Sequence, residues 1–192
     1  MFNDLSSPAA LIASRRSGKP RDMVGPGPSE AELRAIIGQA ARVPDHGKLF
    51  PWRFHIITDR DAFENLLTSA FRTERNVPEK VSLQALKDFA RQGEAIVCVT
   101  SVPVQPSAIP LWEQELSAGA ACLNLLYAVH AAGYVGCWLT GWPSFSETVR
   151  DAFDGPGSRI AGFIFIGSPG QPLEERPRPT LDMVVKSWPP KG

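Results

Sequence analysis

The sequence predicts a domain in which helices pack on a buried β-sheet. Two compact apolar runs, 95–102 (AIVCVTSV) and 162–166 (GFIFI), lie between residues that break regular structure and have the pattern of central strands. Between them, the segment 111–132 has the length of a long helix and carries few charges after Glu115. A helix that is apolar on nearly every side must be covered on nearly every side. In a chain of 192 residues, we therefore expect this helix to pack partly on the sheet and partly on a second subunit.

The amino-terminal part is predicted to consist of two helices joined by an irregular connection. Residues 6–16 are expected to form a short helix, and residues 18–28 hold three prolines and three glycines, which argues against regular structure. Ser29 and Glu32 have the spacing of a capping box, and apolar residues then recur at helical spacing until Pro44.

Strands and helices continue after the second helix. Residues 54–58 (FHIIT) are rich in β-branched and aromatic side chains and predict a strand, and residues 61–71 follow with the spacing of an amphipathic helix. Residues 134–141 (YVGCWLTG) predict a strand that ends in a turn. Residues 144–153 then have the pattern of a helix that is capped by Ser144.

We expect one domain over residues 1–192, with a proline-rich tail from about residue 168. The prolines argue against a compact helix in the tail. The tail is therefore expected to be disordered or held against a surface, such as that of a partner subunit. Its prolines are Pro169, Pro172, Pro177, Pro179, Pro189 and Pro190.

Charge and composition argue against several classes of protein. Lys and Arg total 20, as do Asp and Glu, so the net charge is near zero and a nucleic-acid partner is disfavoured. No window approaches the roughly 18 to 20 apolar residues of a membrane span, and no secretion signal is recognisable. The three cysteines show neither pairing nor metal-ligand spacing, and we expect them to be small buried side chains in a reducing cytoplasm. They are Cys98, Cys122 and Cys137.

The first candidate site is a basic cluster where the first helix gives way to a loop. Arg15, Arg16, Ser17 and Lys19 bring two guanidinium groups, a hydroxyl and an ammonium within five residues. Arg matches phosphate oxygens in geometry and charge, and the hydroxyl and the Lys add a donor and a point charge. The cluster favours phosphate binding, and a solvated basic turn is the alternative.

Two further segments could bind a ligand. The segment from Arg42 to His46 (RVPDH) and the following PWRF run lie in a loop between a predicted helix and a predicted strand, where binding residues are common. His46 could equally well bond only the loop backbone. The stretch 138–142 (WLTGW) offers apolar faces and hydroxyl or small residues, which suit a flat aromatic cofactor, although the tryptophans could instead close the core.

Common catalytic motifs are missing from the sequence. It contains no GxGxxG, Walker, HExxH or GxSxG pattern, and no carboxylate pair has the spacing of a general acid and base. We expect no metal site and no protein nucleophile.

Three stretches together resemble the nitroreductase family, and within it a short bacterial branch of the YdjA type. They are ASRRSGKPRDMVGPGPSEAELRAIIGQAARVPDHGKLFPWRFHII, WEQELSAGAACLNLLYAVHAAGYVGCWLTG and GFIFIGSP. The RRS triplet and the RVPDHG and PWRF segment are the most specific parts. The resemblance implies an α+β fold with a central, mostly antiparallel sheet flanked by helices. It also implies an intertwined homodimer that binds FMN at its interface.

The resemblance also implies roles for individual residues. The RRS triplet would grip the FMN phosphate and ribityl region, Lys19 would lie near the pyrimidine edge of the ring, and a basic residue of the tail would complete the phosphate site. The Asn that many relatives carry before the PWRF-like run is absent, since GKLF stands there. The implied cofactor-binding residues are Arg15, Arg16, Ser17, Lys19, Arg42, His46, Trp138, Leu139, Thr140 and either Arg176 or Arg178.

The function implied by the resemblance is that of an FMN-dependent NAD(P)H oxidoreductase. The flavin itself would carry the chemistry, so no catalytic side chain is expected. NADH or NADPH would reduce the flavin and leave, and a nitroaromatic, quinone or other conjugated acceptor would then take its place, which is a ping-pong scheme. Two alternatives remain: another flavin reduction on the same scaffold, such as dehalogenation or enone reduction, and an FMN-binding storage or sensor protein without turnover.

Overall fold

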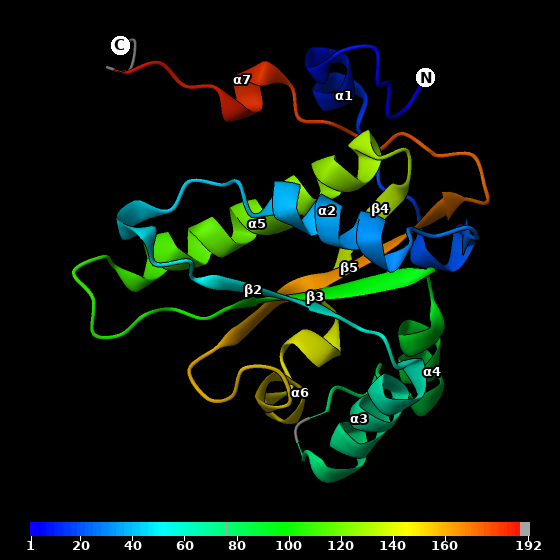
Figure 1. Cartoon of the computed structure of the whole chain (residues 1–192), viewed down its shortest axis with the longest axis vertical. Coiled ribbons are helices and arrows are strands. Elements are labelled where there is room, and N and C mark those ends of the chain that lie inside the picture. Colours follow the sequence, from blue (N-terminus) through cyan, green and yellow to red (C-terminus); the bar gives the residue numbers. More distant parts are fainter. Residues whose placement is uncertain (76, 189–192) are drawn as a thin grey trace.

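A five-stranded antiparallel sheet with helices on both faces organises the computed structural model, which describes residues 1–75 and 77–188 (Figure 1). Long β5 pairs with β1, β3 and β4, and β2 pairs with the other edge of β3. All of these pairings are antiparallel, as the resemblance implied. The strands are β1 Met23–Val24, β2 Trp52–Ile56, β3 Ala95–Ser101, β4 Val135–Leu139 and β5 Arg159–Pro169.

Alternation along β3 and β5 divides the core between the two faces of the sheet. Side chains of a strand point alternately to opposite faces, so the continuous apolar runs supply both. Ile96, Cys98, Phe163 and Phe165 belong to one cluster, which α3 (Arg60–Thr73), α4 (Leu83–Arg91) and α6 (Glu147–Asp151) cover. Val97, Val99, Ile164 and Ile166 belong to the other, under α2 (Glu30–Ala40) and α5 (Leu111–Ala131).

Both central strands predicted from apolar runs are confirmed, whereas β2 begins and ends two residues earlier than predicted. Trp52 already pairs with Ser101, so the strand includes it. At the other end, Asp59 accepts a hydrogen bond from the backbone N–H of Ala62 and caps α3, which requires the chain to turn before it. The side-chain composition identified the strand. It did not reveal that the strand ends at Ile56, before the residue that caps α3.

The first two helices are confirmed with shorter bounds. α1 covers Pro8–Ser14, because Ser7 caps its amino terminus and Arg15 leaves the helical conformation. The capping box of α2 is present in both directions: the Ser29 hydroxyl accepts from the N–H of Glu32, and the Glu32 carboxylate accepts from the N–H of Ser29.

The helix predicted over residues 144–153 exists, but its predicted cap is wrong. Ser146, not Ser144, accepts from the N–H of Val149 and begins α6. The hydroxyl of Ser144 instead donates to the carbonyl of Thr140 in the preceding turn. Two serines two residues apart offer alternative caps, and the turn that follows β4 decides between them.

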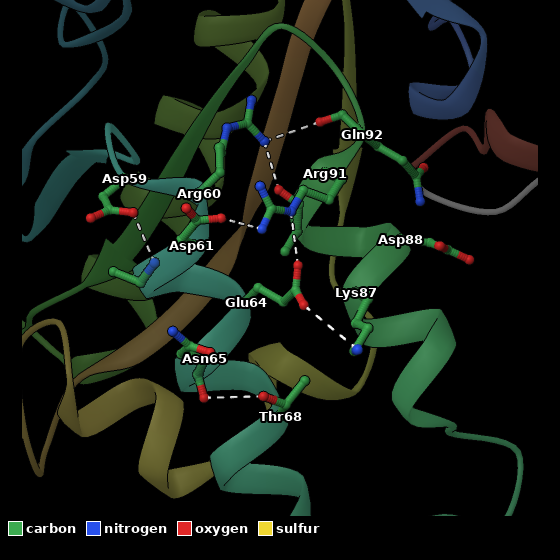
Figure 2. Close-up of polar contacts among 12 residues, drawn as sticks. Asp59, Arg60, Asp61, Glu64, Asn65, Thr68, Lys87, Asp88, Arg91 and Gln92 are labelled. Atoms are coloured by element: carbon green, nitrogen blue, oxygen red, sulfur yellow. Dashed lines mark hydrogen bonds and ion pairs between the residues drawn. The ribbon is translucent and has the colours of Figure 1, made fainter.

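Three of the strands and α-helices were not predicted, namely β1, α4 and the tail helix described below. Figure 2 shows how α4 is fastened to α3: Arg60 donates to the carbonyls of Ala90, near the end of α4, and of Gln92, which caps that end. Arg60 also donates to the carbonyl of Gly93. Arg91 pairs in return with Asp61 and Glu64 of α3. These bonds join residues 27 to 33 positions apart in the sequence, which periodicity alone does not reveal.

The tail contains a short helix, α7 (Leu181–Val184), contrary to the expectation that proline excludes one. The run from Leu181 to Ser187 lacks proline, which leaves room for one helical turn. Pro189 and Pro190 lie outside the described residues. Figure 1 shows α7 and α1 at the same end of the molecule. No helix in the described part of the chain combines the length and apolar character needed to cross a bilayer.

Candidate functional site

The basic residues after α1 meet the tail. Arg16 is only 6% exposed, and its Nε and Nη2 donate to the carbonyl of Glu174 at 2.8 and 2.6 Å. The same Nε lies 3.4 Å from a carboxylate oxygen of Glu175. Lys19 Nζ lies 3.4 Å from the Glu174 carboxylate. The structure thus brings together two segments that lie 158 residues apart in the sequence.

Four guanidinium groups gather at this meeting point. Burial lowers the pKa of Arg16 most, the Glu175 carboxylate opposes that shift, and the nearby charges of Arg178, Arg176 and Arg15 lower the pKa further. Arg16 nevertheless stays protonated, as arginine does in proteins. Such a concentration of positive charge favours an anionic ligand.

Ser17 is held within this cluster of charges. Its hydroxyl oxygen accepts from Nη1 of Arg15 at 3.2 Å, and its hydrogen is left to donate elsewhere. Residues 16–19 line a cavity of about 70 Å³, together with Val135 and residues 169–176 of the tail. The volume corresponds to a few water molecules, so only the phosphate end of a cofactor would fit inside it.

His130 is a buried polar residue near the basic cluster that the sequence did not single out. It lies in the last turn of α5, is 1% exposed, and its Nδ1 is 3.1 Å from the carbonyl of Tyr134. Burial, followed by the charge of Arg15, lowers its pKa to about 4, so the ring is neutral near pH 7. Nδ1 then carries the hydrogen, and Nε2 is an acceptor without a partner among the described residues.

β4 leads from this cluster to the tryptophan-flanked turn. Val135 begins the strand beside the tail, and Leu139 ends it, about 13 Å further along at a strand rise of about 3.3 Å. Among the described strands, β4 pairs only with β5, so the backbone of its other edge is available to a ligand.

The end of β4 carries two apolar side chains that point to opposite faces of the sheet. The Trp138 indole is 37% exposed and donates to the carbonyl of Ala161 at 3.0 Å. Gly162 makes room for it, because a Cβ there would lie 2.0 Å from the indole nitrogen. Leu139 is half-buried in the core, and Thr140 is exposed.

A larger cavity of about 730 Å³ lies beyond Thr140. This volume is within the range of small-molecule sites. Its lining combines the turn after β4 with the segment between α3 and α4 and the start of α6. The residues used below are Arg75, Lys80, Thr140, Trp142 and Phe145.

His46 lies at the other end of the subunit. Its Nδ1 is 2.8 Å from the carboxylate of Glu113, in the first turn of α5. At 1.5 Å per residue, Glu113 and His130 are about 25 Å apart along the helix. The carbonyl of Arg42 accepts from Asn124, near the middle of α5. A single subunit therefore does not bring His46 to the basic cluster.

One face of α5 lacks the cover that its apolar sequence predicts. The sheet and α2 cover the opposite face. Trp112, Leu116 and Leu123 recur at helical spacing and are 61%, 60% and 43% exposed. A contiguous apolar stripe of this kind is typical of a surface that binds another protein.

Comparison with known proteins gives a consistent result. Residues 12–168 match the Nitroreductase family. The chain is 30% identical over 162 residues to the Escherichia coli protein named "Putative NAD(P)H nitroreductase YdjA", an alignment that covers 83% of this chain and 86% of that protein. The fold is similar to that of a nitroreductase-like family protein from Bacillus cereus (TM-score 0.79, 18% identity, 96% and 97% of the two chains). It is also similar to that of a variant of NfnB, an FMN and NADPH-dependent nitroreductase from "sphigopyxis sp. strain HMH" (TM-score 0.69, 18% identity, 95% and 99%).

Proposed function

The chain belongs to the nitroreductase family, and on that premise we propose that it binds FMN as a homodimer and reduces nitroaromatic, quinone or similar conjugated acceptors. Family membership itself makes it a flavin-dependent NAD(P)H oxidoreductase of the nitroreductase type. The proposal adds the acceptor class, the ping-pong order of the two half-reactions and the residues that hold the cofactor.

The observation that carries the proposal is the convergence of Arg15, Ser17 and Arg176 beside Val135, where the open edge of β4 begins. The charge of Arg178 acts on the same cluster through Arg16. Several guanidinium groups around a hydroxyl match a phosphate in charge and hydrogen bonding. A strand edge that leads from there to an exposed indole suits the length and the flat apolar ring of the same ligand. The residues therefore fit FMN.

Bound FMN supplies a ring that takes a hydride from NADH or NADPH and delivers it to an acceptor, so the chain needs no nucleophile of its own. In the proposal, Arg15, Ser17 and the tail arginines hold the phosphate. Lys19 provides positive charge for the pyrimidine edge of the ring, and residues 138–140 pack against the ring.

A second subunit would complete the site. His46 contacts Glu113, which lies about 25 Å along α5 from His130, and this supports a contribution of His46 from the partner. The exposed stripe of α5 supports a two-fold contact in which the two helices run in opposite directions. Such a contact would set the amino end of one α5, with its 42–46 loop, beside the carboxyl end of the other.

The cavity beyond Thr140 is the proposed place for the nicotinamide and then for the acceptor. Trp142 and Phe145 offer it aromatic surface, and its charged lining residues are Arg75, Lys80, Glu74 and Glu147. A single cavity that serves both reactants in turn is consistent with ping-pong kinetics.

Purified protein tests the cofactor and the turnover. We expect a yellow protein that releases FMN on denaturation and loses its colour within seconds when NADH or NADPH is added without oxygen. Colour that persists would instead support a storage or sensor protein. A colourless protein that FMN does not reconstitute would refute the proposal.

The phosphate assignment is tested by substitution. Arg15→Ala with Ser17→Ala should weaken FMN binding by a few kcal/mol in total, on the scale of charge-assisted hydrogen bonds. Fluorescence titration with FMN measures the effect. Arg21→Ala is the control, because Arg21 is exposed and pairs only with Asp22 within the described chain. Equal affinities for the double variant and the control would contradict the assignment.

A further inference from the structure

Arg16 differs from the basic residues around it in burial and in what it binds. Lys19, Arg176 and Arg178 are exposed, and Arg15 is half-buried. Arg16 alone is buried, and two of its nitrogens donate to one backbone carbonyl, that of Glu174. Two of the five N–H donors of the Arg16 guanidinium are thus directed at the backbone of the tail.

The bond to Glu174 fastens a segment with few other attachments. The tail leaves the sheet where Gly170 donates to the carbonyl of Asp22. Residues 171–180 then form no helix or strand. Lys19 adds one exposed ion pair to the Glu174 carboxylate.

Beyond Glu175, the tail forms only local bonds. Arg178 pairs with Glu175, and Lys186 donates to the carbonyl of Asp182. In the range 176–188, no side chain forms a hydrogen bond or ion pair with the described body of the protein before residue 168. Leu173 packs against the core cluster under α3, α4 and α6, so the tail is anchored up to that residue without Arg16. Among the described contacts after Leu173, the buried bonds from Arg16 to Glu174 hold the segment that carries Arg176 and Arg178.

We infer that Arg16 is a positioning residue: it clips the tail to the body and thereby holds Arg176 and Arg178 beside Arg15 and Ser17, instead of gripping the flavin phosphate itself. The ligand in this inference, FMN, comes from the proposed function. The contact between Arg16 and the tail does not depend on that function. A guanidinium is suited to the task, because two donors of its rigid fork converge on one carbonyl oxygen and it stays charged when buried.

Protease sensitivity tests the clip without any cofactor. A glutamate-specific protease should cleave slowly after Glu174 and Glu175 in the wild type, because Arg16 holds the carbonyl of one and contacts the carboxylate of the other. Arg16→Gln should speed this cleavage at least tenfold, with the site identified by mass spectrometry. Arg15→Ala, which leaves the clip intact, should cleave like the wild type. Equal rates for Arg16→Gln and the wild type would overturn the clip.

A double-mutant cycle tests how Arg16 acts on the ligand. Arg16→Gln should raise the Kd for FMN about tenfold or more in the wild-type background, on the scale of charge-assisted bonds. In the Arg176→Ala, Arg178→Ala background it should change that Kd by less than about twofold. Riboflavin, which lacks the phosphate, should bind all four proteins equally. The same rise in both backgrounds would overturn the inference, because it would mean that Arg16 binds the phosphate directly.

Two further measurements distinguish a variant that does not fold from a failure of the proposed function. If Arg16→Gln does not fold, as judged by circular dichroism and Tm, Arg16→Lys replaces it, since a single ammonium keeps the charge but loses the paired bonds. If the wild type binds neither FMN nor riboflavin, the proposed function fails and the ligand role of Arg16 fails with it. The protease result then still decides whether the clip exists.

Discussion

At the scale of single residues, His130 couples stability to pH. Its pKa in the folded chain is about 4, below the ordinary value of 6.5. Between these values the unfolded chain binds a proton that the folded chain does not, so the free energy of unfolding falls as pH falls from 6.5 to 4. The shift corresponds to a loss on the order of 3 kcal/mol at the acid end of the window.

Removal of the imidazole should flatten this part of the pH profile. His130→Gln keeps a donor for the carbonyl of Tyr134 but does not titrate. Urea unfolding at pH 7, 5.5 and 4.5 should therefore show a smaller decline for the variant than for the wild type. Parallel profiles would mean that His130 does not control acid stability.

The RRS triplet shows what sequence can and cannot say about a single residue. Its composition indicated phosphate chemistry, but nothing in it distinguishes Arg15 from Arg16. The difference arises because the carbonyl of Glu174, 158 residues further on, lies against one of them. His130 was missed for a similar reason: a histidine in an apolar helix gives no signal until the end of that helix is known to lie beside the basic cluster.

At the scale of elements, the α3–α4 pair depends on Arg60. This side chain donates to the carbonyl of Ala90 in the last turn of α4 and to those of Gln92 and Gly93, which follow the helix. Hydrogen bonds to a charged group contribute about 1.5 to 3 kcal/mol, and the loss of several leaves carbonyls without a protein donor. Arg60→Ala should therefore lower the free energy of unfolding by about 2 to 3 kcal/mol.

Chemical denaturation measures this effect, and Arg72→Ala provides the matched control. Arg72 lies in the last turn of the same helix with its side chain exposed. Surface substitutions of this kind usually change stability by less than about 0.5 kcal/mol. Similar midpoints for the two variants would show that Arg60 does not hold α4.

The elements that sequence predicted are those whose signal is local. Apolar runs marked β3 and β5, helical spacing marked α2 and α3, and an apolar stretch with few charges marked α5. The capping box marked where α2 begins. β1 was missed because two residues carry no periodicity, and its pairing with Ser168 and Pro169 of β5 is long-range. α4 is short, and no strand, capping or glycine signal was recognised around it.

At the scale of the whole molecule, the sequence predicted the mixture of helices and sheet, and the resemblance supplied the antiparallel arrangement, which the structure confirms. The intertwined homodimer remains a proposal. Within one subunit the basic cluster and His46 lie at opposite ends of α5, which no reading of local sequence could reveal. The distance follows only once Glu113 and His130 are fixed on one continuous helix.

A substitution that breaks the proposed dimer should therefore also weaken FMN binding. Leu116 lies in the middle of the exposed stripe of α5 and is 60% exposed, so Leu116→Asp should not disturb the core of the subunit. It should place a charge in the proposed interface, where an unpaired buried charge is costly. We expect size-exclusion chromatography to show a monomer, and FMN titration to show at least a tenfold rise in Kd, because the 42–46 loop would come from the second subunit.

Ala85→Asp is the matched control for that variant. Ala85 is exposed on α4, which covers the opposite face of the sheet from α5. This control should remain dimeric and bind FMN like the wild type. A Leu116→Asp protein that is monomeric but keeps its FMN affinity would contradict the shared site, because one subunit would then supply everything the cofactor needs. A variant that stays dimeric would contradict the interface itself, since a carboxylate in the middle of a dry apolar stripe has no partner to offset its desolvation.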